Sequence, residues 1–170
     1  LVSRSELRRM VEKRIKELRN QFDKPAYLGT LTPEEQSAAR KLAETAVPAQ
    51  AGAVSVTKLK EYSAAIDIIR SIHTINLEGY GAIELEAVLN KFSIYFYQTT
   101  TRSPPNATID FEHHRIIIFA NSIEELSAEL LSMILIHEAA EFTLIIGYQV
   151  ARDIAHGLAE QATEVLIPQL

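Results

Sequence analysis

Residues 126–146, which read LSAELLSMILIHEAAEFTLII, decide the fold. Apolar side chains recur on nearly every side of a helix drawn through this stretch, and a helix that is apolar all round is buried inside a protein. Ser122 and Glu125 precede it with the spacing of a capping box, and Gly147 follows it as a candidate C-cap. The sequence therefore predicts one long central helix against which the other elements pack.

The segments on either side of this helix predict a small sheet before it and a further helix after it. Residues 92–101 (FSIYFYQTTT) are rich in aromatic and β-branched side chains, which favours a strand. Residues 107–111 and 115–119 flank the turn Glu112-His113-His114 and predict a hairpin. Residues 148–167 predict the last helix, which Pro168 ends.

The first half of the chain is predicted to be helical. One helix begins with Thr32 as N-cap, Pro33 at its first position and Glu35 at its third. The helices expected there cover residues 3–22, 32–47, 56–74 and 83–90. We therefore expect an α+β fold, mostly helical, with a small antiparallel sheet preceding the buried helix. A basic N-terminal helix (1–24) and the body (25–170) would form one globular unit.

Composition narrows the possible chemistry. The chain has 170 residues, 47% of them hydrophobic, and no cysteine. The absence of cysteine excludes disulfides, thiol catalysis and thiolate metal sites, so any metal must be held by histidine and carboxylate. No uninterrupted run of about 18 apolar residues and no hydrophobic leader pattern stand out. We therefore expect a soluble, cytoplasmic protein without membrane contact.

The net charge of -5 is unevenly distributed, because residues 1–24 carry +4 and the remainder -9. A basic helix on an acidic body can contact nucleic acid, an anionic surface or an acidic partner. It can equally pack against its own body or form a solvated face, and a charge run alone favours these simpler interpretations. The aromatic residues near 92–97 lack interleaved basic residues, so nucleic-acid binding is not favoured.

Three titratable side chains interrupt the apolar helix: His137, Glu138 and Glu141. Burying such groups without partners is costly, so they are expected to be paired, hydrogen-bonded or metal-bound. His137 and Glu141 are four residues apart and project from one helix face. Glu138 lies about 100° round the helix from His137 and can reach a water on the same ion without being a ligand.

The next helix offers a second set of such side chains, because His156, Glu160 and Glu164 follow at a spacing of four. The turn between the two helices lies about ten residues after His137 and about nine before His156, so an antiparallel pair brings them to similar height. His137, Glu141 and His156 then supply two nitrogens and one oxygen, the ligand set of a catalytic zinc with an open position. We expect Glu160 to orient His156 or to replace a ligand.

The pattern His137-Glu138-Ala139-Ala140-Glu141 with a downstream histidine resembles the active-site region of zincin-type metalloproteases over about residues 107–164. That family has a strand, then a helix carrying His-Glu-x-x-His, then a third ligand on a later helix. The resemblance implies that residues 115–119 form the edge strand lining the substrate cleft. It also implies that Glu138 is the general base activating a zinc-bound water, and that peptides or proteins are substrates. The chain departs from the motif at Glu141, where the family has histidine.

Other interpretations remain open. His137 can be a core histidine hydrogen-bonded to Glu141 without metal. A di-iron or di-manganese site is a further metal chemistry, but it requires Glu-x-x-His on two helices, which the long helices here lack. The competing function is a non-enzymatic interaction module, in which the His/Glu cluster is structural and the basic helix binds an acidic partner. We expect His113 and His114 to be solvated, and His73 to cap a helix C-terminus.

Overall fold

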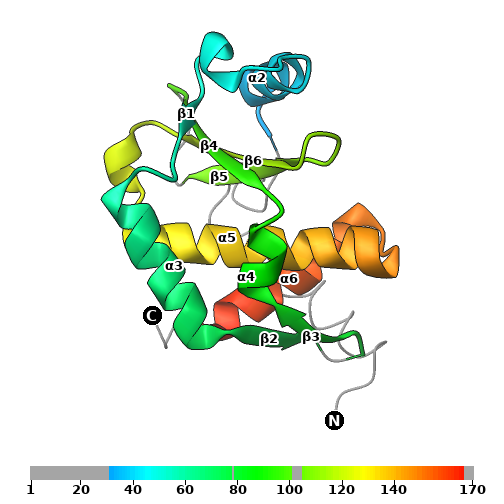
Figure 1. Ribbon diagram of the computed structural model, residues 1–170. Coiled ribbons are helices and arrows are strands. Elements are labelled where there is room, and N and C mark those ends of the chain that lie inside the picture. The colour runs from blue at the N-terminus through cyan, green and yellow to red at the C-terminus, as the bar shows by residue number, and fades with distance from the viewer. Residues whose placement is uncertain (1–30, 78, 101–104, 167–170) are drawn as a thin grey trace.

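The computed structural model describes residues 31–77, 79–100 and 105–166. The helix predicted over residues 3–22 and the basic segment 1–24 lie outside the described residues. The described chain has the α+β fold that the sequence predicted. A four-stranded sheet lies between helix α2 (Pro33–Ala43) on one face and helix α5 (Ala128–Phe142) on the other (Figure 1).

The order of the strands in this sheet is β1 (Val54–Ser55), β4 (Ser93–Gln98), β6 (Arg115–Ala120) and β5 (Asn106–Asp110). Strands β5 and β6 form the predicted antiparallel hairpin. The sequence did not predict that β4 and β6 would run parallel. This pairing arises because the strand that follows β4 in the chain, β5, lies at the edge of the sheet and not beside β4. The chain then returns as β6, which lies between β4 and β5.

Strand β5 is therefore an edge strand, whereas β6 is not. The expectation that residues 115–119 form the edge was wrong, because β6 pairs with β4 on one side and with β5 on the other. Both faces of β6 are covered as well, which explains its continuous apolar run. Ile116 and Ile118 belong to the core shared with α5, whereas Ile117 and Phe119 pack with residues of α2.

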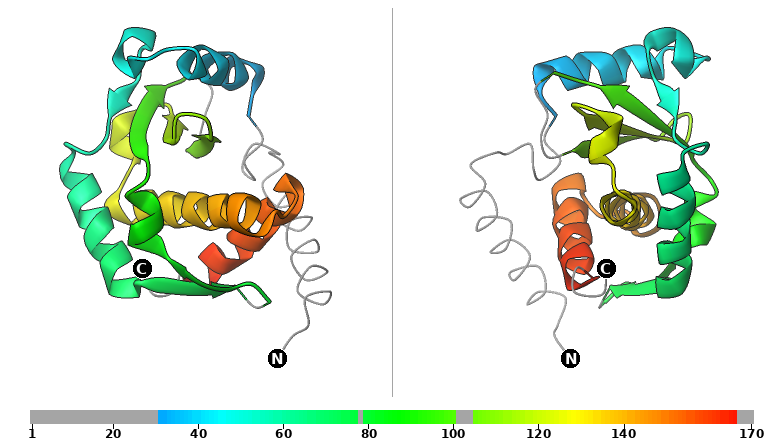
Figure 2. Two further views of the ribbon diagram at one scale, coloured as in Figure 1. Left: turned by 45° about the vertical axis from the view of Figure 1, so that its right-hand side comes forward. Right: turned by 90° about the vertical axis from the view of Figure 1, so that its left-hand side faces the viewer.

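Helix α5 is the buried centre of the molecule, as predicted. Figure 2 shows it end-on, with α3 (Lys60–Ile72) and α6 (Arg152–Leu166) on opposite sides. It continues into a π-helical turn, Thr143–Gly147. By length and composition alone the run Ala128–Gly147 is long and apolar enough to cross a membrane. This differs from the expectation that no apolar run of about 18 residues stands out in the sequence. Since 56% of the most apolar 18-residue window of this run is buried inside the protein, as in the core helix of a soluble fold, this is weak evidence of a membrane span.

The start of α5 differs from the prediction. The side chain of Ser127 is the N-cap and accepts a hydrogen bond of 3.2 Å from the backbone N–H of Leu130. Ser122 makes no capping hydrogen bond with its side chain and precedes a short 3₁₀ turn, Ile123–Glu125. Leu126 is buried in a non-helical conformation, which delays the helix by one turn.

A second, two-stranded sheet was not predicted. Strands β2 (Thr74–Leu77) and β3 (Gly81–Glu84) form an antiparallel hairpin before the short helix α4 (Leu85–Leu89). His73 ends α3 as its C-cap, as predicted, with a left-handed φ of 69°. Strands β2 and β3 have only four residues each. A pattern of buried and exposed side chains over four residues is too short to stand out in the sequence.

Helix α2 begins with the predicted cap, in which Thr32 and Glu35 exchange hydrogen bonds with each other's backbone N–H groups. It ends at Ala43, four residues earlier than expected. The buried Arg115 of β6 donates hydrogen bonds to the carbonyls of Leu42 (3.0 Å) and Thr45 (2.8 Å) just at this end. This arginine therefore holds the C-terminal end of α2 to the sheet.

Candidate metal centre

Helices α5 and α6 bring three of the predicted side chains into contact. On α5, Nε2 of His137 lies 3.0 Å from Oε2 of Glu141. On α6, Nδ1 of His156 lies 3.1 Å from Nε2 of His137 and 3.1 Å from Oε2 of Glu141. These three atoms form a nearly equilateral triangle between the two helices, which we call the ligand triangle.

Hydrogen bonds alone cannot give all three atoms of the ligand triangle a suitable partner. A ring nitrogen either donates or accepts, and an ionised carboxylate oxygen only accepts. When three such atoms are in mutual contact, at least one pair has the same role, so two donors or two lone pairs face each other at 3.0–3.1 Å. A single cation that takes a lone pair from each atom removes this conflict, so the donor set fits a metal ion.

The dimensions of the ligand triangle fit a small divalent cation. Zinc binds histidine nitrogen and carboxylate oxygen at about 2.0–2.2 Å, which places two tetrahedral ligand atoms roughly 3.3–3.6 Å apart. The observed separations of 3.0–3.1 Å are within a few tenths of an ångström of that value. A nitrogen and oxygen set without sulfur also suits other first-row divalent ions.

Glu160 lies beside His137, although the sequence suggested His156 as its partner. Its Oε2 is 3.4 Å from Nδ1 of His137, because the carboxylate reaches across from α6 to α5. A carboxylate on the second nitrogen of a ligating histidine fixes the ring and its tautomer. The donor atoms of His137, His156 and Glu160 also lie within 4.8 Å of one another, so the predicted alternative of Glu160 as a ligand remains open.

Neighbouring charges shift the protonation of the site. Burial disfavours the imidazolium of His137, but its hydrogen bond to Glu141 and the nearby carboxylates outweigh burial and raise its pKa to about 9. Burial also opposes the carboxylate of Glu141, yet hydrogen bonds from His137 and His156 lower its pKa to about 2. Burial and the charge of Glu141 together raise the pKa of Glu138 to about 8. An ion that binds at neutral pH therefore displaces the proton of His137.

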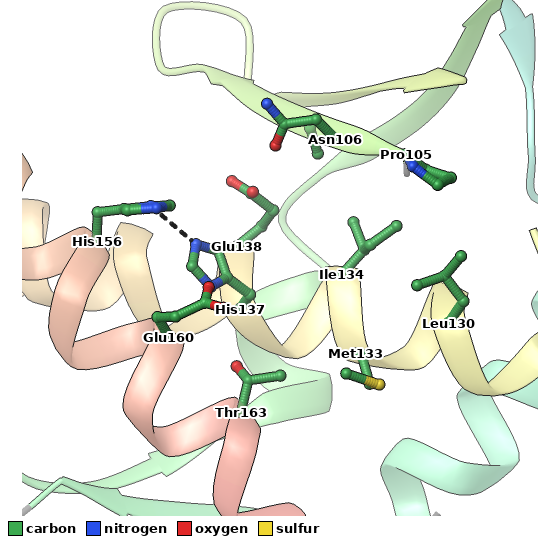
Figure 3. A pocket seen from close by; sticks show the side chains of 11 residues that line it. Pro105, Asn106, Leu130, Met133, Ile134, His137, Glu138, His156, Glu160 and Thr163 are labelled. Carbon is green, nitrogen blue, oxygen red and sulfur yellow. Dashed lines mark hydrogen bonds and ion pairs between the residues drawn. The ribbon is translucent and has the colours of Figure 1, made fainter. Parts of the chain in front are cut away.

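Glu138 lines a cavity next to the ligand triangle. Figure 3 shows its carboxylate beside the two imidazole rings, on the side that faces β5. The cavity has a volume of about 100 Å³, which is room for roughly three waters or one small organic group. The lining residues are Pro105, Asn106, Ala107, Leu130, Met133, Ile134, His137, Glu138, His156, Glu160 and Thr163. One end of the cavity is therefore titratable and the rest is mostly apolar.

Part of this lining was not predictable from the sequence. Leu130, Met133 and Ile134 lie on the same helix as His137, one to two turns before it. Their spacing is the one that any core-facing helix shows, so no signal in the sequence separates cavity wall from packed core. Asn106 precedes the strand predicted over residues 107–111, whereas in the structure it begins the edge strand β5.

The remaining histidines make their described contacts elsewhere. His113 is exposed in the β5–β6 turn, with Nδ1 3.0 Å from the carboxylate of Asp110. His114 is also exposed in this turn and packs edge-on against Phe92 and Phe142. Glu164 belongs to α6, but its side chain lies outside the described residues.

Comparison with protein-family models, curated protein sequences and solved structures found no match for this chain. The resemblance to zincins therefore remains a prediction that depends on the motif of His137 to Glu141 and on His156. The function must be argued from the geometry of the site.

Proposed function

We propose that this chain is a zinc-dependent, peptidase-like hydrolase. The observation that carries the proposal is the ligand triangle of His137, Glu141 and His156, with separations of 3.0–3.1 Å, beside the cavity-lining Glu138. Three protein ligands of this kind leave one position of a zinc ion open to water or substrate, as in catalytic zinc sites.

Each side chain has a distinct role in this proposal. Zinc held by His137, Glu141 and His156 would supply a Lewis acid for a carbonyl and would lower the pKa of a water to about 7. Glu138 takes a proton from the attacking water and delivers it to the leaving amine when the C–N bond breaks. Its raised pKa of about 8 in the metal-free protein is consistent with a group that exchanges protons near neutral pH. Glu160 fixes the ring of His137.

The position of β5 favours an extended peptide as the substrate. This strand lies at one edge of the described sheet, and its first residues, Asn106 and Ala107, line the cavity. An edge strand offers backbone N–H and C=O groups with which an extended chain can pair. A peptide aligned in this way would pass the carboxylate of Glu138.

Metal analysis with paired variants tests the proposal. After dialysis against metal-free buffer and reconstitution, we expect about one zinc per chain in the wild type and loss of zinc in His137→Ala. Glu138→Gln should retain zinc and lose about 10²–10⁴-fold in peptide hydrolysis. Glu129→Gln, the same change near the start of α5 and outside the cavity lining, is the matched control. Full turnover by Glu138→Gln would contradict the mechanism.

The second candidate is a metal-free polar network in a non-enzymatic interaction module. It is favoured by the raised pKa of His137 and the lowered pKa of Glu141, which describe a stable imidazolium–carboxylate pair. In this case the wild type binds no zinc even when zinc is added. Neutralising Arg8, Arg9 and Arg14 would then abolish binding to an acidic partner.

A further inference from the structure

A buried amide on strand β5 has no role in the chemistry described so far. Asn106 is only 9% exposed, and its Nδ2 has no hydrogen-bond partner in the described part of the chain. Native proteins seldom leave a buried donor unpaired, because such a group loses its hydration without compensation. Asn106 lines the same cavity as Glu138 and His156, and Figure 3 shows its side-chain amide across from Glu138, with the oxygen nearer to that carboxylate than the nitrogen. A half-turn about the Cβ–Cγ bond, a torsion with two roughly equivalent positions, brings Nδ2 to the same side.

The other polar groups of the cavity already have partners or charges. The hydroxyl of Thr163 donates to the carbonyl of Ala159 at 2.8 Å. The two histidines belong to the ligand triangle through Nε2 of His137 and Nδ1 of His156, whereas Nε2 of His156 has no described partner. Among the residues that line the cavity, the amide of Asn106 and Nε2 of His156 are therefore the side-chain groups left without a partner, and only Asn106 lies on β5, outside the ligand triangle.

We propose that Nδ2 of Asn106 donates a hydrogen bond to the carbonyl oxygen of an acyl substrate held between β5 and Glu138. This inference rests on the proposed hydrolytic function and narrows its substrates to acyl compounds whose carbonyl oxygen faces β5. A carbonyl oxygen that leaves water needs a donor, and negative charge develops on this oxygen during hydrolysis. A neutral donor held on a strand can stabilise that charge with no more than a turn of its amide.

The amide nitrogen of Asn106 makes no described hydrogen bond that would serve the fold. Asn106 pairs with Phe119 of β6 in the sheet register, a strand position that an apolar side chain can also occupy. Asn106→Leu should therefore raise the melting temperature of the metal-free protein, because it removes an unsatisfied donor. An amide that served the fold would give the opposite result.

The test compares the zinc-loaded wild type with the zinc-loaded variants Asn106→Leu and Thr99→Val. Thr99 is the matched control, because it is 2% exposed, has an unpartnered Oγ1 and is not among the cavity-lining residues. Zinc affinity is measured by competition with a chromogenic chelator. The affinity for acetohydroxamate, a small acyl probe, is measured by calorimetry.

We expect both variants to bind zinc like the wild type and to melt at higher temperature. Asn106→Leu alone should bind acetohydroxamate about tenfold more weakly, the effect of one hydrogen bond. If Asn106→Leu does not fold, Asn106→Asp keeps the shape, removes the donor and should show the same loss.

Several outcomes overturn the inference. Wild-type affinity for acetohydroxamate in zinc-loaded Asn106→Leu would overturn it and leave the proposed function standing. A lowered melting temperature with unchanged probe affinity would assign Asn106 to the fold. A wild type that binds no zinc would overturn the proposed function and this inference together.

Discussion

Nε2 of His137 lies 3.1 Å from Nδ1 of His156, although the two residues are 19 positions apart in the sequence. Their rings meet edge to face, with centroids 4.7 Å apart. Two imidazolium rings at this distance would repel each other, whereas two neutral rings that share a cation would be drawn together. The state of this pair therefore determines how strongly α5 and α6 are held to each other.

Zinc should stabilise the protein through this pair. At a zinc concentration of 100 times Kd, binding adds about 2.7 kcal/mol to the free energy of unfolding, which raises Tm by roughly 5–10 °C in a chain of this size. His156→Ala should lose this shift, because it removes one corner of the ligand triangle. Thermal unfolding with zinc and with EDTA measures the effect. His113→Ala, an exposed histidine of the β5–β6 turn, should keep the full shift.

Glu160→Gln should weaken zinc binding by about 10–100-fold without abolishing it. The amide cannot hold the second nitrogen of His137 as the carboxylate does at 3.4 Å. Competition with a chelator of known affinity measures the change. Asp153→Asn, an exposed position on the same helix, should bind zinc like the wild type. Unchanged affinity in Glu160→Gln would remove the carboxylate from the support of His137.

The metal-free protein should lose stability as the pH rises from about 6.5 through about 9. The pKa of His137 is raised from 6.5 to about 9, so its stabilising contribution is complete below 6.5 and lost through 9. Glu138, with its pKa raised from 4.5 to about 8, adds a loss in the same direction. Melting temperatures in EDTA across this range test the expectation.

Zinc should act in the opposite direction. Because the ligating form of His137 is neutral, zinc affinity and the zinc-dependent rise in Tm should both increase with pH over the same interval. His137→Gln should flatten the pH dependence of the metal-free protein. A melting temperature that does not change between these pH values in the wild type would contradict the assigned protonation states.

Arg115→Met should lower the free energy of unfolding by about 2–4 kcal/mol, because it leaves the backbone carbonyls at the end of α2 without their donor. Urea denaturation measures this loss, and zinc binding should be unchanged. Arg70→Met is the comparison, since Arg70 forms an ion pair of 2.8 Å with Glu86 while remaining 59% exposed. Such an exposed pair contributes less than about 1 kcal/mol.

The central helix could be predicted because its composition is unusual along its whole length, and the spacing of His137 and Glu141 follows from helix geometry alone. The meeting of His137 with His156 required only that two consecutive helices be antiparallel. Both predictions therefore depended only on patterns within short, neighbouring stretches of the sequence.

Features that depend on distant parts of the chain were not predictable in this way. The parallel pairing of β4 with β6 depends on where the chain places β5, and no local pattern specifies that position. Asn106 became part of the site only because this edge strand lies over α5. The partner of Glu160 was misassigned because its side chain reaches across to another helix rather than along its own.

The sheet separates two hydrophobic clusters of unequal size. The cluster on the α2 face contains only a few side chains, including Leu42 and Phe119, whereas the other face holds the large core around α5. In native-state hydrogen exchange, amides of α2 should therefore exchange through local opening, while those of α5 should exchange only when the whole molecule unfolds. Fluctuations of the protein would then be concentrated on the face opposite the ligand triangle, and the helix bearing His137 would be the last to lose its protection.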